Sequence, residues 1–416
     1  MNPAKSSYHN KTEYYNRLFL LKFLLYFRCR AGRARQRKRP SRLTGQVILT
    51  LCRRARKLYL INLLGYLEKA GIHNELARNA MTETRLQDET LVDDFGRTVN
   101  YLRISVTDRC DFRCIYCMEE EMAFVPRAQL LTLEELSTIA GAFTELGVTK
   151  IRITGGEPLV RRNVLKLFED LGRLPGLNEL VTTTNGSQLA RLAKPLRAAG
   201  VKRINISLDS LDPEKFRRIT RVGDLHKVLT GIDAALEAGF DKIKINSVIL
   251  KNRNHQEVTD LVRFAAGRNM DISFIEEMPL GSIGDHDRAE AYYSSDRIRQ
   301  DLEKSFTLLP TTETTGGPSK YFKIMETGTR VGFISPHSHN FCDSCNRVRL
   351  TCEGRLLLCL GQEHSVDLRK VVRSHPGDME KLKDAIRRSM SIKPKGHEFD
   401  LAAKPVIFRH MNVTGG

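Results

Sequence analysis

The chain has 416 residues, of which 41% are hydrophobic and 28% charged, and its formal net charge is +18. This composition is typical of a globular protein of two or three domains, and it excludes collagen-like and wholly disordered chains. No apolar run approaches the roughly 20 residues that cross a bilayer, so the sequence predicts no membrane span.

The positive charge is concentrated in the first fifth of the chain. Residues 1–80 contain 18 lysines and arginines against three acidic residues, whereas residues 81–416 carry a net charge of only +3. The basic segment has three interpretations: a surface arm for nucleic acid or anionic lipid, an Arg-rich targeting segment, or sequence upstream of the true start. We favour the last, because normal acidic content begins at Met81, and we assign residues 1–80 no part in the fold. The nearly neutral remainder does not indicate nucleic-acid binding.

From about residue 98, short β-rich runs alternate with amphipathic helical stretches. This alternation is typical of a parallel sheet with helices outside it, and six units favour a barrel or partial barrel. An open doubly wound sheet is the alternative. Thr132 and Glu135 have the spacing of a capping box that opens the first helix. Strands are predicted over 101–106, 150–154, 179–184, 203–208, 242–249 and 271–275, and helices over 132–146, 163–174, 188–199, 224–238 and 255–268.

Polar and glycine-rich residues follow several of the predicted strands. Thr107–Cys110 follows the first strand, Gly155–Pro158 the second and Asp209 the fourth. In both candidate folds, ligands bind at the carboxyl ends of the strands, so we expect the site at this edge of the sheet. The alternation stops at residue 311, which divides the remaining chain into regions 88–310 and 311–416.

A first group of cysteines lies directly after the first predicted strand. Cys110, Cys114 and Cys117 follow a C-x3-C-x2-C pattern. Clustered cysteines without a signal peptide are typical of metal ligands in a reducing compartment. Three thiolates can hold three irons of a cubane and leave the fourth open to a small molecule. A structural zinc loop is the alternative, but zinc normally takes four ligands and no fourth is evident nearby.

A second group of cysteines has a C-x2-C-x13-C pattern and offers another cluster with an open iron. Its members are Cys342, Cys345 and Cys359. Arg347 and Arg349 follow closely, and alternate residues of an extended chain share a face, so both guanidiniums are placed to bind one anionic ligand. Cys352 is either an extra ligand or a buried, inert thiol, and we favour the thiol because this residue breaks the spacing.

These motifs resemble those of a known superfamily. The C-x3-C-x2-C group with Tyr116 before its last cysteine, and the Gly155–Pro158 segment, resemble the radical S-adenosylmethionine superfamily over roughly residues 98–280. Three further features narrow the resemblance to the GTP 3′,8-cyclase family: Phe274–Pro279, the C-x2-C-N-R-x-R run and the terminal Gly-Gly. That resemblance covers about residues 88–416.

The resemblance implies an α/β fold, a partial (β/α)6 TIM-like barrel, with a C-terminal α+β region that carries a second iron–sulfur cluster. It implies one 4Fe–4S cluster on Cys110, Cys114 and Cys117, chelated by S-adenosylmethionine. It implies another on Cys342, Cys345 and Cys359, where guanine binds. The implied S-adenosylmethionine contacts are Tyr116, Gly156, Ser207 and Met278, and the implied GTP contacts are Arg103, Lys150, Arg152, Thr183, Lys244, Arg347, Val348 and Arg349.

The reaction that the resemblance implies is the first step of molybdenum cofactor biosynthesis. Reductive cleavage of S-adenosylmethionine gives methionine and a 5′-deoxyadenosyl radical, which removes the ribose 3′ hydrogen of GTP. The carbon radical attacks guanine C8, and reduction with protonation yields 3′,8-cyclo-7,8-dihydro-GTP. Gly415 and Gly416 match a tail that assists this chemistry. The predicted cations fit the substrate, because a buried triphosphate needs compensating positive charge.

The resemblance also implies partners and a location. It implies a flavodoxin- or ferredoxin-like electron donor, a downstream cyclic pyranopterin monophosphate synthase, a homodimer and a cytoplasmic location, without nucleic-acid or membrane partners. Two residues depart from the family pattern. Ser273 stands where Arg is frequent, so one phosphate contact is expected to be absent or replaced, and Cys352 stands where a small residue is common.

Two other functions compete with the cyclase. One is a radical S-adenosylmethionine enzyme that modifies a peptide and uses its second cluster as an electron relay. Asn346–Arg349 and the terminal Gly-Gly favour the cyclase over it. The other is a non-catalytic zinc-binding regulator with a basic arm for nucleic acid. The nearly neutral body and the Gly155–Pro158 segment argue against this regulator.

Overall fold

The structure is a computed structural model that describes residues 90–284, 286–401 and 407–415. The chain divides into two compact units, Met1–Thr84 and Arg85–Gly416. Every described residue belongs to the second unit, so the interpretation of residues 1–80 falls outside the described part. Within the described ranges, none of the helices has the length and apolar character that crossing a membrane would need.

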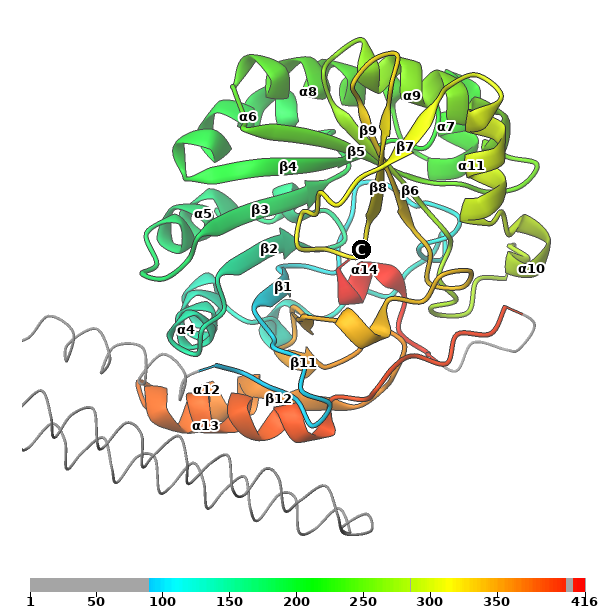
Figure 1. Cartoon of the computed structure of the whole chain (residues 1–416). Helices are drawn as coiled ribbons and strands as arrows, with labels where there is room; N and C mark the ends of the chain where they lie inside the picture. Colours follow the sequence, from blue (N-terminus) through cyan, green and yellow to red (C-terminus); the bar gives the residue numbers. More distant parts are fainter. Residues whose placement is uncertain (1–89, 285, 402–406, 416) are drawn as a thin grey trace, which may run out of the picture. The chain divides into compact units, whose positions relative to one another are not determined.

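A single mixed sheet of twelve strands organises the described residues. Its strands follow the order β12-β11-β10-β1-β2-β3-β4-β5-β6-β9-β8-β7, and β1 to β6 are parallel neighbours in chain order. The order never reverses within these six strands, which excludes the doubly wound alternative and confirms the partial barrel (Figure 1). The six are β1 (Tyr101–Ser105), β2 (Lys150–Thr154), β3 (Glu179–Thr184), β4 (Val201–Ser207), β5 (Lys242–Val248) and β6 (Asp271–Ile275).

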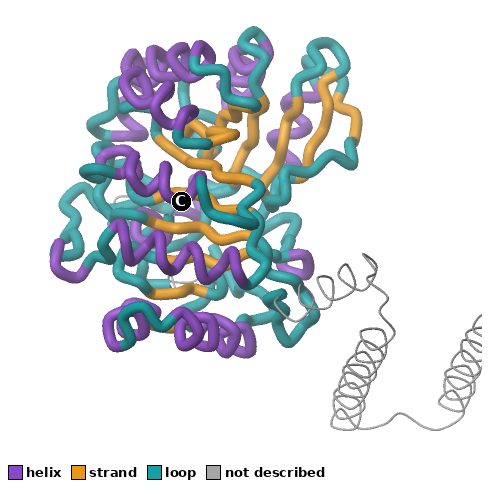
Figure 2. The backbone as a smooth tube through the Cα atoms, turned by 90° about the vertical axis from the view of Figure 1, so that its left-hand side faces the viewer, coloured by secondary structure: helices purple, strands orange, loops and turns teal. Residues whose placement is uncertain are grey.

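Helices cover the outside of the central strands (Figures 1 and 2). They are α4 (Leu133–Glu145), α5 (Val164–Gly172), α6 (Leu189–Ala198), α7 (Pro213–Thr220), α8 (Leu225–Glu237) and α9 (Val258–Ala266). The capping box is confirmed, because Thr132 and Glu135 exchange both of its hydrogen bonds. Helix α7 was not predicted. Its start carries the signal of an Asp212 N-cap followed by a proline, but the helix has only eight residues.

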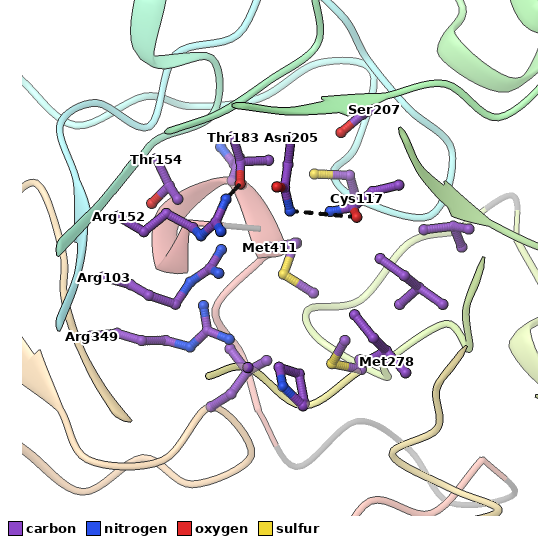
Figure 3. A pocket seen from close by; sticks show the side chains of 18 of the residues that line it. Arg103, Cys117, Arg152, Thr154, Thr183, Asn205, Ser207, Met278, Arg349 and Met411 are labelled. Atoms are coloured by element: carbon purple, nitrogen blue, oxygen red, sulfur yellow. Dashed lines mark hydrogen bonds between the residues drawn. The ribbon is translucent and has the colours of Figure 1, made fainter. Parts of the chain in front are cut away.

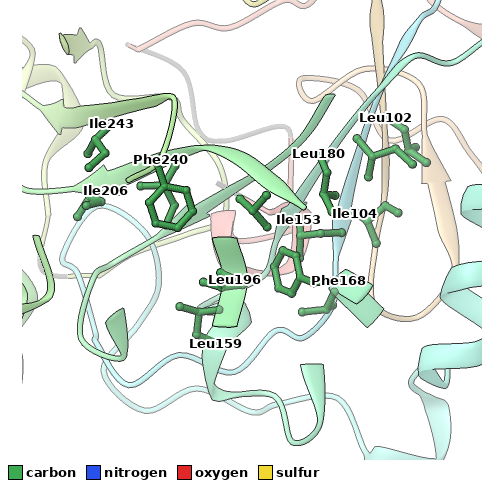
Figure 4. Packing of buried hydrophobic residues seen from close by; sticks show 14 of the residues in the cluster. Leu102, Ile104, Ile153, Leu159, Phe168, Leu180, Leu196, Ile206, Phe240 and Ile243 are labelled. Carbon is green, nitrogen blue, oxygen red and sulfur yellow. The ribbon is translucent and has the colours of Figure 1, made fainter. Parts of the chain in front are cut away.

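Strand alternation separates the core from the interior of the barrel. Leu102 and Ile104 of β1 are fully buried among apolar residues such as Ile153 and Phe168 (Figure 4). Burying each of these side chains contributes about 1.5–3 kcal/mol. Successive residues of a strand face opposite sides, so Arg103, between Leu102 and Ile104, faces the cavity. The burial of Leu102 and Ile104 in the core thereby fixes the side of β1 on which Arg103 faces the cavity.

The C-terminal region extends the barrel sheet at both edges. Strand β10 (Arg347–Leu350) runs parallel beside β1, and β9 (Arg330–Ile334) runs parallel beside β6. Local sequence patterns do not predict these pairings. The outer strands are β11 (Arg355–Leu357), β12 (Ser365–Asp367), β8 (Lys320–Ile324) and β7 (Leu308–Pro310). The remaining helices are α10 (Arg288–Ala291), α11 (Ser295–Glu303), α12 (Leu368–Ser374), α13 (Met379–Ser389) and α14 (Met411–Thr414), with 3₁₀ turns η3 (Arg127–Gln129), η4 (Pro158–Val160), η5 (His255–Glu257), η6 (Cys342–Ser344) and η7 (Met390–Ile392).

Candidate active site

One cavity of about 270 Å³ collects the predicted site residues inside the barrel. The six predicted cluster cysteines, the four predicted S-adenosylmethionine contacts and the eight predicted GTP contacts all line it. Figure 3 shows Arg103, Arg152 and Arg349 at one side of the cavity, with Cys117, Ser207 and Met278 at the other. The cavity therefore has a cationic end and a sulfur-rich end.

The cationic end is a row of three arginines on neighbouring strands, which we call the arginine row. The sheet register pairs Arg103 of β1 with Arg349 of β10 on one side and with Arg152 of β2 on the other. Neighbouring strands lie about 4.8 Å apart, so the three like charges repel one another. Burial and this repulsion lower the pKa of Arg103 to about 10 and the pKa of Arg349 well below its usual range. A bound anion would relieve the repulsion.

Tyr101 lies two residues before Arg103 and within the same cation cluster. Its hydroxyl accepts a 2.6 Å hydrogen bond from Arg152 Nε, and Lys150 Nζ lies 4.9 Å from its ring centre. Burial opposes the phenolate, but the charges of Arg152, Arg103 and Lys150 lower the pKa of Tyr101 to about 6. Lys150 itself pairs with Glu179 at 2.7 Å. Tyr101 was missed in the sequence, although its spacing from Arg103 places both on one face.

Further polar groups continue along the sheet. Arg152 Nη1 donates a 2.9 Å hydrogen bond to Thr183 Oγ1, and Lys244 Nζ donates a 3.2 Å bond to Tyr321. Burial lowers the pKa of Lys244. Ser273, the residue that departs from the family pattern, is fully buried and lies 3.0 Å from the hydroxyl of Ser319. It supplies no charge to the cavity.

The first cysteine loop is fixed by hydrogen bonds around its thiols. The backbone N–H of Phe112 donates to Cys110 Sγ at 3.3 Å, and Tyr116 donates to Asp209 Oδ2 at 2.7 Å. Burial raises the pKa of Cys117 to about 12 and also raises those of Cys110 and Cys114. Without a bound cation these groups are thiols. An iron cluster would supply the positive charge that thiolates need, so the donor set fits one.

The Gly155–Pro158 segment packs directly against this loop. Gly156 N donates to Thr107 O at 2.7 Å, and a β-carbon on Gly156 would lie 2.5 Å from Arg109 O. Only glycine permits this approach. Burial raises the pKa of Glu157 to about 8, and its carboxyl group accepts hydrogen bonds from Thr184 and from the backbone of Asn185. The segment thus links the ends of β2 and β3 to the cysteine loop.

The second cysteine loop lies at the edge of the same cavity. Arg97 Nη1 donates to Cys342 O at 2.8 Å, and the buried Lys393 Nζ lies 3.6 Å from Cys345 Sγ. Burial opposes the thiolate, but Arg347 and Lys393 lower the pKa of Cys345 to about 7. Cys352 is fully buried away from the cavity lining, and burial raises its pKa to about 12, as expected of an inert thiol.

The geometry also bears on the zinc alternative. Within the ranges that the structure describes, no three His, Cys, Asp or Glu side chains converge as a single-ion site would require. A multi-iron cluster needs its thiolates further apart than one zinc ion does.

The C-terminal tail enters the cavity. Figure 1 shows α14 inside the barrel. The carbonyl oxygen of Gly415 accepts hydrogen bonds from Arg103 Nη2 at 3.0 Å and from Arg349 Nη1 at 2.8 Å. Gly415 has a φ of 75°, and a β-carbon there would lie 2.1 Å from Thr154 Oγ1, so glycine is required. Gly416 falls outside the described residues.

Some residues that line the cavity were not predicted from the sequence. They include Tyr101, Asn205, Met411 and Asn412. Alternation along β1 and β4 could have indicated the first two. Nothing in the local pattern indicates the tail residues, because their position depends on contacts with strands that are distant in the sequence.

Comparisons with known proteins agree with this geometry. Residues 104–265 match the family model of the radical SAM superfamily, and residues 270–399 match the model described as Molybdenum Cofactor Synthesis C. Solved structures of Streptococcus suis SuiB resemble the fold. SuiB bound to precursor peptide SuiA is 17% identical, with a TM-score of 0.52 over 84% of this chain and 86% of that chain. This likeness concerns the fold alone.

Curated relatives match at much higher identity. The GTP 3′,8-cyclase of Saccharophagus degradans is 60% identical over 331 residues, which are 80% of this chain and 100% of that protein. Those of Pseudomonas entomophila and Pseudomonas savastanoi pv. phaseolicola are 60% and 59% identical, with 98% and 100% of their lengths covered. On this identity and coverage, the chain belongs to the GTP 3′,8-cyclase family of radical S-adenosylmethionine enzymes.

Proposed function

We propose that the chain converts GTP to 3′,8-cyclo-7,8-dihydro-GTP in the first step of molybdenum cofactor biosynthesis. The observation that carries the proposal is the single cavity with the arginine row at one end and both cysteine triads along its wall. A 4Fe–4S cluster with S-adenosylmethionine, when bound, supplies the 5′-deoxyadenosyl radical that removes the ribose 3′ hydrogen. The chain's own residues hold the two ligands and exclude water.

The arginine row is proposed to bind the triphosphate. Its three guanidiniums present forked donors that suit phosphate oxygens, and the triphosphate would remove their mutual repulsion. Lys150 and Lys244 extend the positive charge along the same face. Arg347, Val348 and Thr183 complete the proposed substrate contacts. Ser273 is neutral and its hydroxyl is hydrogen-bonded to that of Ser319, so we propose that it makes no phosphate contact.

The two cysteine triads are proposed to hold two 4Fe–4S clusters. Cys110, Cys114 and Cys117 would hold the cluster that binds S-adenosylmethionine, near Tyr116 and Gly156. Ser207 and Met278 lie along the same part of the wall and are the remaining proposed contacts. Cys342, Cys345 and Cys359 would hold the second cluster, beside the guanine. Gly415 and Gly416 are proposed to assist the radical chemistry.

The remaining partners follow from the reaction. We propose a low-potential flavodoxin- or ferredoxin-like donor, because reductive cleavage consumes an electron that GTP does not supply. The product passes to a cyclic pyranopterin monophosphate synthase. We propose a cytoplasmic location, where thiols stay reduced. The homodimer is proposed from the family resemblance alone.

The test uses the full chain reconstituted without oxygen with iron and sulfide. It is incubated with S-adenosylmethionine, dithionite and GTP, and products are identified by mass spectrometry. We expect 5′-deoxyadenosine and the cyclised nucleotide, both dependent on GTP. Deoxyadenosine without loss of GTP would reject the substrate and favour the peptide-modifying alternative.

Cys342→Ala should lower iron content by about half and abolish cyclisation, whereas Cys352→Ala, the matched control, should retain both the iron and the activity.

A further inference from the structure

The C-terminal tail runs the length of the cavity and contacts both of its ends. Gly281 N donates to Ile407 O at 2.8 Å where the tail enters. Met411 N then donates to Cys117 O at 3.2 Å, beside the first cysteine loop. Further along the tail, the carbonyl oxygen of Gly415 accepts hydrogen bonds from Arg103 and Arg349 of the arginine row. The tail is therefore a shared wall of the two proposed ligand sites.

Asn412 is the tail residue with an unsatisfied polar atom in the cavity wall. Its side chain is 1% exposed and lines the cavity. Nδ2 donates a 2.8 Å hydrogen bond to the backbone carbonyl of Asp108, and since a carbonyl only accepts, this bond fixes which end of the amide is oxygen. The buried Oδ1 has no hydrogen-bond partner among the described residues. A buried acceptor of this kind is costly unless a ligand satisfies it.

The surroundings of Asn412 indicate which ligand. The same Asp108 carbonyl packs against the glycine segment, because a β-carbon on Gly156 would lie 2.7 Å from its oxygen. The backbone of Asn412 also lies beside the Cys117 thiol, whose pKa it lowers against the larger effect of burial. The Oδ1 atom thus lies beside the cysteine loop and the glycine segment, at the sulfur-rich end. The arginine row is contacted by a different part of the tail, Gly415.

We propose that Asn412 Oδ1 accepts a hydrogen bond from the amino group of S-adenosylmethionine, which makes Asn412 a cofactor-binding residue supplied by the tail. The proposal deepens, and rests on, the proposed function. An amide oxygen requires a donor. S-adenosylmethionine chelates a cluster through the amino and carboxylate groups of its methionine moiety, and of these two only the amino group donates.

Cofactor binding and tail seating would then reinforce one another. S-adenosylmethionine that bonds Asn412 stabilises the seated tail, and the seated tail presents Gly415 to Arg103 and Arg349. By linkage, a variant that unseats the tail weakens cofactor binding by the factor by which the bound cofactor stabilises the seated tail. Asn412 adds a direct contact to this indirect effect, so the two contributions can be separated.

The experiment measures the dissociation constant of S-adenosylmethionine for the anaerobically reconstituted full chain by equilibrium dialysis. Asn412→Ala should weaken binding by about 10- to 100-fold, the loss expected for a hydrogen bond to a charged or metal-polarised group. The deamino analogue of S-adenosylmethionine should bind wild type and Asn412→Ala with similar affinity, because it lacks the donor. GTP binding to Asn412→Ala should stay within about threefold of wild type, which establishes that the variant is folded.

His410→Ala is the matched control for tail seating. His410 Nε2 hydrogen-bonds Ser282 O at 2.9 Å outside the cavity, so this variant loosens the tail without removing a cavity group. An equal loss in His410→Ala and Asn412→Ala would overturn the direct contact, as would unchanged cofactor affinity in Asn412→Ala or a loss that persists with the deamino analogue. If wild type itself fails to bind S-adenosylmethionine, the proposed function fails instead.

Discussion

Single charged groups in the cavity are controlled by their neighbours rather than by solvent. Tyr101 has its pKa lowered to about 6 because three cations outweigh the effect of burial. Cys345 is influenced in the same direction by Arg347 and Lys393. The protonation of each group therefore depends on the ligand that binds beside it. One prediction concerns Tyr101, and another concerns Lys393 beside Cys345.

Tyr101 should make GTP binding depend on pH. Above about pH 6 the free protein holds a phenolate at this position. Bound GTP brings negative charge, which raises the pKa, so binding takes up a proton and weakens as pH rises. We expect the GTP dissociation constant of wild type to rise by up to about tenfold per unit between roughly pH 6 and 8. In Tyr101→Phe, this rise should vanish and leave only the effect of GTP's own ionisation.

The measurement is calorimetric titration with GTP at several pH values. Tyr293→Phe is the control, because Tyr293 hydrogen-bonds Asp301 outside the cavity. Equal pH slopes in wild type and Tyr101→Phe would remove Tyr101 from the linkage.

Lys393 should tune the second cluster that we propose. Its ammonium lies 3.6 Å from Cys345 Sγ and is buried, so it favours the more negative, reduced state. Lys393→Met keeps the volume and removes the charge. We expect the reduction potential to fall by roughly 60 mV, which corresponds to about 1.4 kcal/mol for one electron. Potentiometric electron paramagnetic resonance checks this, and the exposed Lys395→Met should leave the potential unchanged.

At the scale of elements, the turn after β2 places the glycine segment against the first cysteine loop. Two hydrogen bonds hold the segment in place. Gly156 N donates one to Thr107 O, and Thr184 Oγ1 donates the other to the carboxyl group of Glu157. It is rigid because its backbone is closely packed, not because its own side chains are large. The position of the loop therefore depends on the absence of a side chain at Gly156.

Gly156→Ala should displace the cysteine loop. A β-carbon 2.5 Å from Arg109 O and 2.7 Å from Asp108 O meets backbone that can yield only by moving the loop. We expect at least about a tenfold loss of S-adenosylmethionine affinity in equilibrium dialysis, by analogy with the loss of one charged hydrogen bond. Gly141→Ala in α4 is the control, because its β-carbon meets only Leu174 at 3.8 Å. Retained affinity in Gly156→Ala would show that the loop adapts.

At the scale of the whole molecule, the barrel and the C-terminal region form one sheet. Local patterns predicted β2, β3 and β6 with the observed bounds, because each has buried residues between clear turns. They did not predict β10 beside β1, since that pairing joins Tyr101 to Arg347 across the chain. Of the eighteen predicted residues that line the cavity, the six cysteines, Arg347 and Arg349 were indicated by their spacing and the other ten by motif resemblance, whereas Asn412 required the folded tail.

The chain that begins at Met81 should retain the site. Curated relatives align over their full length with 80% of this chain, and every described contact lies beyond residue 89. We expect removal of residues 1–80 to change iron content and the dissociation constants for GTP and S-adenosylmethionine by less than about twofold. Iron analysis and equilibrium dialysis check this. A loss of either ligand would give the basic segment a part in the site.

The pairing of β1 with β10 also sets the order in which the site can be assembled during synthesis. Arg103 leaves the ribosome about 250 residues before Arg349, its partner in the arginine row. Non-local pairings of this length form late, after the local βα units. A nascent chain can therefore complete the first cysteine loop long before it can hold the nucleotide. Because Gly415 follows Arg349 by 66 residues, the wall shared by both ligands closes later still.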